Sequence, residues 1–315
     1  MFNIVERRYW YFFLSALVLV PGIISLVVFG LPRAIDFAGG TMYVMQFESP
    51  EAVTEEGLRE IYAANGFEEA HVVEQHDPET GELLRHQVRS TEVSPMEKAA
   101  LDADLEAAFG PFDVLLFETV GPSVGAEVTR NATIAVALAA IGIMLYLSFV
   151  FRAVPHPVRY GVCAIIAMLH DVFVVLGLAS IMGWLFGWEI DALFLTALLT
   201  VIGFSVHDSI VVFDRIRENV GRLRGIPYEQ VVNHSIIQTL DRSINTQLTA
   251  LFTLVAVYAF SQGELEQFVF WLIVGLISGT YSSIFNAAPL LVVWENREWR
   301  TWFGRGDETT AETAA

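Results

Sequence analysis

Charged residues are scarce in this 315-residue sequence, and basic residues are the scarcer kind. Only 17% of the residues are charged, with 18 Lys and Arg against 36 Asp and Glu, for a formal net charge of -18. Soluble domains usually carry about 25% charged residues, and surfaces that bind nucleic acid are basic because they face phosphates. The composition therefore argues against an ordinary soluble protein and against a nucleic-acid partner.

The sequence has a single cysteine and no phosphate-binding glycine loop. The one cysteine, Cys163, lies in an apolar run, so no disulfide forms within the chain and metal motifs with two or more thiolates are excluded. We expect Cys163 to be a small buried residue. No GxxxxGK[ST] sequence is present, which argues against ATP hydrolysis. We expect no cofactor, no metal and no enzymatic activity.

Hydrophobic residues are abundant instead, at 54% of the chain, and most lie in six long runs. About 20 mostly apolar residues form a helix that crosses a bilayer. The six runs are Trp10–Gly30, Asn131–Phe151, Tyr160–Phe186, Ala192–Phe213, Ser243–Phe260 and Phe268–Trp294. The first is too long for a cleaved signal peptide and lacks an evident cleavage site. The sequence predicts a six-helix membrane bundle with both termini on one side of the lipid bilayer.

The distribution of arginine indicates on which side of the membrane the termini lie. The arginines that flank the spans are Arg7, Arg8, Arg152, Arg159, Arg215, Arg217, Arg222, Arg224, Arg297, Arg300 and Arg305. The opposite loops, residues 187–191 and 261–266, contain neither Lys nor Arg. Cytoplasmic loops carry the excess of Lys and Arg, so we expect both termini to be cytoplasmic.

The segment 36–125 is too long for a loop and predicts a separate domain on the outer side. Strands are expected at Thr41–Phe47, Ala70–Gln75, Leu83–Ser90 and Phe112–Thr119, with helices at Thr54–Asn65 and after Ser94. Ser94 and Glu97 have the spacing of a capping box. The order β-α-β-β-α-β predicts a ferredoxin-like α+β domain. The remaining divisions are 1–35 with the first span, 126–294 with the other five, and a cytoplasmic tail, 295–315.

Ionisable and polar residues occur in three of the predicted spans. His170 and Asp171 lie in the third, and His207 and Asp208 lie in the fourth. Polar residues at helical spacing lead into the fifth and continue along it, namely Gln238, Arg242, Asn245, Thr249 and Thr253. Each ionisable group costs roughly 2.5 kcal/mol or more to insert, so such groups usually face the protein interior and mark ion or substrate pathways.

Asp208 and Arg242 are the leading candidates for an ion-coupling site. Both are expected near the cytoplasmic ends of their helices, at similar depth. A carboxylate that alternates between an arginine partner and an unpaired, protonated state would exchange a proton in each cycle. A static tie between helices is the alternative. For His170 and Asp171, polar packing and a role in the ion path stay equally open.

Five motifs resemble the SecD and SecF family. They are Asp36–Thr41 (DFAGGT), Val120–Gly125 (VGPSVG), Gly203–Asn219 (GFSVHDSIVVFDRIREN), Arg242–Thr246 (RSINT) and Gly279–Ser283 (GTYSS). The family patterns are D-F-x-G-G-T, V-G-P-x-V/I-G, G-Y/F-S-x-N-D-T-V/I-V-V-F-D-R-I-R-E-N, R-S/T-I/L-N-T and G-T/A-Y-S-S. The resemblance covers nearly the whole chain in the right order.

The resemblance implies an RND-superfamily fold in the bacterial inner membrane. It also implies a function together with SecD, the SecYEG channel and, indirectly, SecA. In that function, proton or sodium flow helps to draw unfolded exported polypeptides across the membrane. By position, Asp208 and Arg242 are similar to the essential Asp and Arg of the family. The motif containing Asp36, Gly39, Gly40 and Thr41 is similar to one thought to support the outer domain and its hinge.

One position departs from the family pattern. His207 stands where the family usually has Asn. An imidazole titrates near neutrality, which leaves the choice between proton and sodium open; a plain replacement of the Asn hydrogen bonds is the alternative.

Two other functions fit parts of the sequence. The His-Asp pairs, with Glu189 and Asp191, suggest an intramembrane metallohydrolase, but no HExxH spacing is present and the two acidic residues are expected at the outer face. An RND exporter of small molecules or lipids usually has twelve spans and two large outer domains. This chain has half of each, which favours an obligate partner.

Overall fold

A computed structural model describes residues 3–68, 70–76, 83–152 and 156–298. They fall into two compact units. The sheet domain is Arg33–Ile134, and the helical unit is Met1–Pro32 with Ala135–Ala315. The expected tail from residue 299 onward, with Arg300 and Arg305, lies outside the described residues.

Six helical segments among the described residues are long and apolar enough to cross a membrane, which confirms the six predicted spans. The elements are η1 (Val5–Arg7), α1 (Arg8–Val28), α5 (Pro122–Val150), α6 (Pro157–Phe186), α7 (Ala192–Arg222), α8 (Tyr228–Phe260), α9 (Glu264–Ser282), η3 (Ser283–Ala287) and α10 (Ala288–Glu295). Helices α7 and α8 extend beyond the apolar runs because polar helix formers continue them. The turn between them contains Gly225, at φ +87°, and Pro227.

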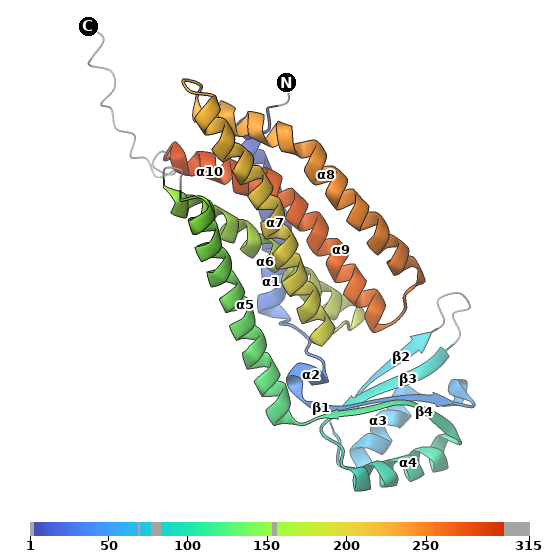
Figure 1. Cartoon of the computed structure of the whole chain (residues 1–315). Coiled ribbons are helices and arrows are strands. Elements are labelled where there is room, and N and C mark those ends of the chain that lie inside the picture. Colours follow the sequence, from blue (N-terminus) through green and yellow to red (C-terminus); the bar gives the residue numbers. More distant parts are fainter. Residues whose placement is uncertain (1–2, 69, 77–82, 153–155, 299–315) are drawn as a thin grey trace. The chain divides into compact units, whose positions relative to one another are not determined.

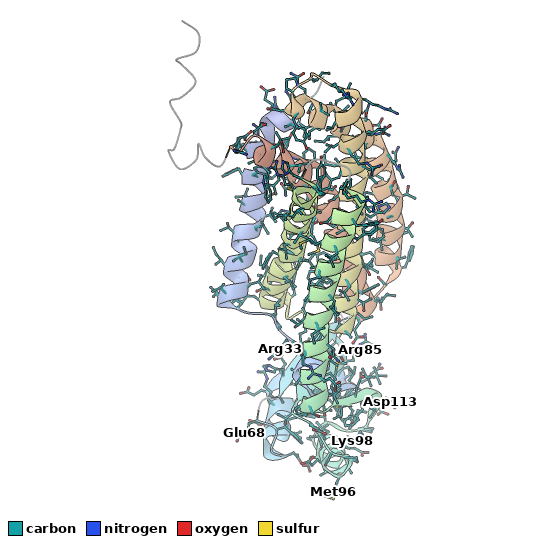
Figure 2. The ribbon with its side chains drawn as sticks, turned by 60° about the vertical axis from the view of Figure 1, so that its left-hand side comes forward. Arg33, Glu68, Arg85, Met96, Lys98 and Asp113 are labelled. Carbon is teal, nitrogen blue, oxygen red and sulfur yellow. The ribbon has the colours of Figure 1, made fainter. Side chains whose placement is uncertain are left out.

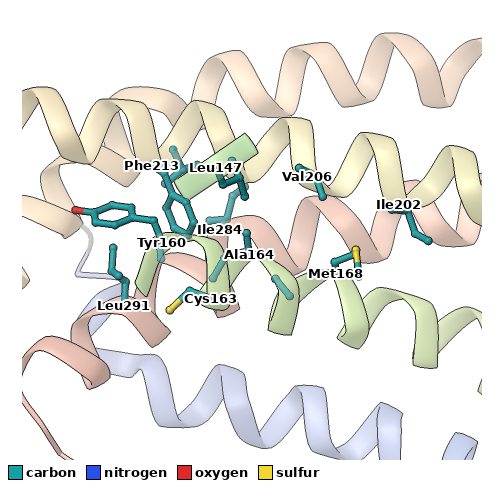
Figure 3. Packing of buried hydrophobic residues seen from close by; sticks show 14 of the residues in the cluster. Leu147, Tyr160, Cys163, Ala164, Met168, Ile202, Val206, Phe213, Ile284 and Leu291 are labelled. Carbon is teal, nitrogen blue, oxygen red and sulfur yellow. The ribbon is translucent and has the colours of Figure 1, made fainter. Parts of the chain in front are cut away.

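Helices α6, α7 and α9 pack against one another in the helical unit (Figure 1). The apolar windows of α6, α7 and the α9–α10 segment are each 50% buried, against 11% for α8 and 6% for α5. Tyr160, Cys163 and Phe213 lie together in the core (Figure 3). Cys163 is fully buried, as predicted. The two helices that the chain itself covers least are therefore α5 and α8.

Glycines allow the closest helix contacts in this unit. A Cβ atom on Gly177 of α6 would lie 2.6 Å from Gly22 Cα of α1, and one on Gly275 of α9 would lie 2.0 Å from Val201 Cγ2 of α7. Small residues at such points let helix backbones approach in membranes. The Gly275 face of α9 therefore packs directly against α7.

The sheet domain contains a four-stranded antiparallel sheet in the order β2-β3-β1-β4. Its elements are α2 (Ile35–Ala38), β1 (Gly40–Phe47), η2 (Pro50–Ala52), α3 (Glu55–Ala64), β2 (His71–His76), β3 (Leu83–Ser90), α4 (Pro95–Phe109) and β4 (Phe112–Val120). In the central strand β1, Tyr43 pairs with Val88 of β3 and with Phe117 of β4. Every predicted strand and both predicted helices are present.

Helix α4 begins with the capping box that the sequence predicts. Ser94 Oγ accepts from the Glu97 amide, and Glu97 Oε2 accepts from the Ser94 amide at 2.8 Å. Hydrogen bonding by the Ser94 side chain and backbone holds the pKa of the Glu97 carboxyl below its usual value. Further along α4 is Lys98, labelled in Figure 2. Its Nζ lies 2.6 Å from Asp102 and 4.9 Å from the centre of the Tyr43 ring. Burial and the hydrogen bond to Asp102 raise the pKa of Tyr43.

Candidate ion-coupling site

Asp171 lies on α6 inside the helical unit and accepts hydrogen bonds from three hydroxyl groups. Ser205 on α7 donates at 2.5 Å, and Ser278 and Ser282 on α9 each donate at 2.6 Å. His170 Nδ1 lies 3.0 Å from Asp171 Oδ1. A carboxylate offers about four lone-pair sites, so the oxygens of Asp171 are saturated. This side chain, 1% exposed, ties the three central helices together.

Asp208 on α7 is nearly as buried as Asp171 but has far fewer partners. It is 3% exposed, and Ser283 Oγ on η3 donates to its Oδ2 at 3.2 Å. Across the described ranges, Asp208 has no further hydrogen bond and no ion pair. A buried carboxylate with a single hydroxyl donor is poorly compensated. Of these two buried carboxylates, Asp171 is saturated and Asp208 is not.

Arg242 on α8 is exposed on this chain. Among the residues that the structure describes, no ion pair joins it to Asp208. Their pairing stays a prediction. A partner chain at this face would change the surroundings of the guanidinium.

The predicted polar stripe of α8 lies on the exposed side of that helix, including Asn245 and Thr249. The threonine hydroxyls donate to the backbone one turn earlier: Thr249 to Asn245 O at 2.8 Å and Thr253 to Thr249 O at 3.1 Å. His207, next to Asp208 on α7, is also exposed. Polar side chains exposed along two helices that cross a bilayer need a covering surface other than lipid.

The two glycine motifs of the sheet domain pack on each other. A Cβ on Gly39, where φ is +76°, would lie 2.8 Å from Pro122 Cα, and one on Gly125 would lie 2.8 Å from Gly39 N. Thr41 Oγ1 accepts from the Val93 amide at 2.8 Å. Asp36 lies in the short helix α2, just before these residues. The motifs therefore form one compact joint where β1 begins and where β4 passes into α5.

We expect Gly39→Val to destabilise this joint. Its φ is unfavourable for a branched residue, which costs roughly 1–3 kcal/mol, and its Cβ would overlap the backbone of Pro122. Limited proteolysis of the membrane-inserted protein should cut the sheet domain faster than in the wild type. Gly66→Ala is the matched control, because Gly66 has φ +91° but open space around its Cβ. Equal cleavage rates for Gly39→Val and Gly66→Ala would contradict the role given to the close contact.

Among the described residues, those that suggest a metallohydrolase do not form a metal-binding cluster. Asp191 Oδ1 accepts from the Phe194 amide at 2.6 Å and caps α7. Within the described part of the chain, no group of three or more His, Cys, Asp or Glu side chains has the arrangement of a metal site.

Four buried polar residues of the helical unit were not predicted as site residues. They are Ser205, Ser243, Gln247 and Ser278. Pairs of polar residues four apart were a usable signal, since Ser205 with Ser209 and Ser278 with Ser282 share a helix face. Which face turns inward depends on packing between helices, and a single sequence does not reveal that.

A bundle of six membrane-crossing helices that keeps carboxylates in its interior defines an integral membrane protein of the transport type. Two protein-family models match this chain and agree with that class. Residues 101–297 match the SecD/SecF C-terminal model, described as a protein export membrane protein, and residues 24–51 match the SecD/SecF GG motif. The chain belongs to the SecF family of protein translocase subunits.

Relatives of known name cover the chain almost end to end. Protein translocase subunit SecF of Thermobaculum terrenum is 50% identical, over 99% of this chain and 100% of the relative. The SecF of Anaerolinea thermophila is 48% identical, over 97% and 98%. The crystal structure of SecDF from Thermus thermophilus, titled a translocon-associated membrane protein, is similar with a TM-score of 0.80 and 35% identity. That match covers 94% of this chain but 39% of the SecDF chain.

Proposed function

We propose that this SecF-family chain combines with a SecD-type subunit in the bacterial inner membrane and promotes late translocation of unfolded polypeptides through the SecYEG channel. Proton or sodium flow through the membrane helices drives the process, and SecA takes part indirectly. The chain works as a coupling subunit and not as an enzyme. The observation that carries the proposal is the buried, unsaturated Asp208 on α7, a helix that packs against α8, whose polar face this chain leaves open.

The open face of α8 supports the SecD-type partner. Only 11% of the apolar window of α8 is buried, and its mean hydropathy is 1.3, the lowest of the six spans. Arg242 and Asn245 are exposed on it. The Thermus thermophilus relative is a single SecDF chain of which this chain spans 37%. A partner equivalent to the remainder would cover α8 with protein.

The contrast between Asp171 and Asp208 supports Asp208 as the group that cycles. Asp171 has its full set of donors, whereas Asp208 has one hydroxyl at 3.2 Å. A group that exchanges an ion must lose and regain partners, which is easier where few are fixed. Arg242 and His207 would act on Asp208 from the partner-facing side, with Asn245 and Thr249 along the route. In this assignment, His170 and Asp171 support the route by holding the helices.

The sheet domain is proposed to face outward as a ferredoxin-like domain. Its β-α-β-β-α-β order and the strand order β2-β3-β1-β4 support that fold. Arginines at the other ends of the spans, such as Arg8, Arg159 and Arg222, support cytoplasmic termini. The joint containing Gly39 and Gly40 would carry movement of the membrane helices into this domain.

Co-purification with a SecD-type partner, followed by ion-flux measurement in vesicles, tests the proposal. We expect a stable complex, and a flux across the vesicle membrane that depends on pH or on sodium and rises when an unfolded polypeptide is being translocated. A chain that binds no SecD-type subunit, or a complex that conducts no ion and leaves export unchanged, would refute it.

A further inference from the structure

A cavity of about 600 Å³ lies where the turn between α7 and α8 meets the N-terminal segment. The turn and the end of α10 lie at the same end of the helical unit (Figure 1). One wall of the cavity is apolar, and the other carries polar side chains. The apolar residues are Leu223, Ile226 and Pro227, and the polar ones include Glu229, Gln230 and Asn233. Exposed apolar surface with a polar rim is typical of an interaction site.

Hydrogen bonds between the N-terminal segment and α8 hold the polar wall in place. Asn233 Oδ1 accepts from the amides of Ile4 and Val5, at 2.8 and 3.3 Å. The guanidinium of Arg8 donates to Glu229 Oε1 at 3.1 Å. A surface that is already ordered loses little conformational freedom when a segment binds to it. The cavity is therefore a preformed site.

The described part of the chain ends next to this cavity. After α10, Arg297 takes the left-handed conformation, at φ +52°, and the Glu298 amide donates to Val293 O at 3.2 Å. This is a Schellman motif, which turns the backbone out of the helix. Arg8 then binds Glu298 Oε1 at 2.8 Å. Because one guanidinium holds both Glu229 and Glu298, residue 298 lies beside the polar wall.

The residues that follow have the chemistry of the two walls. Positions 299–305 read WRTWFGR, with three aromatic residues, two arginines and no acidic residue. Aromatic side chains bury about 150–250 Å² each. Arg8 supplies one positive charge to two carboxylates, Glu229 and Glu298, so one negative charge stays available to a further arginine. Trp302 is four residues beyond Glu298, which gives a reach of up to roughly 13 Å.

We propose that residues 299–305 bind in this cavity and form a C-terminal clamp. Trp302 and Phe303 cover the apolar wall, and Arg300 lies against Glu229. The clamp fastens the turn between α7 and α8 to the end of α10. This inference goes beyond the proposed function and does not depend on it.

The clamp restrains the hairpin that contains the candidate coupling residues. Asp208 lies on α7 and Arg242 on α8, so any displacement of these two helices at their common turn requires release of the segment. Aromatic and basic residues also favour the surface of a bilayer. The anchored position of Glu298 and the apolar wall around Ile226, which is 43% exposed, favour the cavity.

Labelling of an introduced cysteine with a water-soluble maleimide tests the clamp. The protein is held in lipid nanodiscs, which leave both faces of the bilayer accessible. Gln230→Cys is placed in the polar wall, in the full chain and in a chain that ends at Glu298; Cys163 is fully buried and does not interfere. We expect labelling at least about tenfold faster in the shortened chain, because a covered thiol reacts only after local opening.

Two matched controls separate the clamp from a general effect. Arg224→Cys, an exposed position of the same turn outside the cavity lining, should be labelled equally in both chains. In the full chain, joint replacement of Trp302 and Phe303 by Ala should speed the labelling of Gln230→Cys as the truncation does. Joint replacement of Thr309 and Thr310 by Ala should not.

Equal labelling of Gln230→Cys in the full and shortened chains would overturn the proposal. Trypsin protection of Arg300 and Arg305 in that case would place the segment on the lipid surface and leave the cavity unfilled. If the shortened chain fails to fold, the double alanine variant of Trp302 and Phe303 decides, since it keeps the full length. Slow labelling in that variant would equally refute the clamp.

Discussion

Export stimulation is expected to fall in Asp208→Asn to the level of vesicles that lack the chain. The amide has nearly the shape of the carboxylate and can still accept from Ser283, so packing is preserved. It cannot take up a proton or neutralise a cation. If ion exchange at Asp208 drives movement, the loss is complete and not partial. In vitro translocation of an unfolded precursor into inverted vesicles measures it.

A matched control lies on the same helix. Asp214 is an exposed carboxylate of α7 that pairs with Arg217 at 2.6 Å, and exposed pairs of this kind contribute about 0–1 kcal/mol. Asp214→Asn should therefore leave export unchanged. Arg242→Ala should abolish stimulation as Asp208→Asn does, with insertion and partner binding intact. Undiminished export in both Asp208→Asn and Arg242→Ala would remove the ion-coupling assignment.

Much of the architecture follows from local patterns in the sequence. Apolar runs of bilayer length predict the six spans, and two-residue alternation predicts the strands, because both signals are carried by neighbouring residues. The capping box at Ser94 is of the same kind: the two partners are three residues apart, and the structure contains both hydrogen bonds. Helix ends were less well predicted. Helix α8 begins at Tyr228, well before its apolar part.

The contacts between buried side chains are harder to predict from the sequence, because they depend on how the helices are rotated against each other. Asp171 and Asp208 both follow a histidine in an apolar span, and the sequence made them look alike. Packing gives Asp171 three serine donors, whereas Asp208 has a single serine donor at 3.2 Å. Ser278 lies more than a hundred residues from Asp171 along the chain. Only the fold brings such residues together, so only the structure separates the saturated carboxylate from the unsaturated one.

Asp171→Leu is expected to lower the thermal stability of the helical unit more than Asp208→Asn, Asp214→Asn or Arg242→Ala. It would leave the hydroxyls of Ser205 and Ser278 without an acceptor, and would deprive Ser282 of its 2.6 Å bond, keeping only a 3.2 Å contact with Gly279 O. Each lost buried bond costs roughly 1–3 kcal/mol. Thermal unfolding followed by tryptophan fluorescence, with size-exclusion profiles as a check on aggregation, measures the loss.

The conservative variant shows whether hydrogen bonding is the cause. Asp171→Asn keeps one carbonyl acceptor but replaces the other oxygen with a donor, so it should fall between Asp171→Leu and the wild type in melting temperature. Asp208→Asn, which loses no comparable set of bonds, should melt close to the wild type. If Asp171 positions the helices and Asp208 couples the ion, the melting temperature of Asp171→Leu is therefore the lowest and that of Asp208→Asn is close to the wild type. If Asp171→Leu melted as the wild type does and yet conducted no ions, Asp171 would belong to the ion path itself, and the division between a fixed and an exchangeable carboxylate would be wrong.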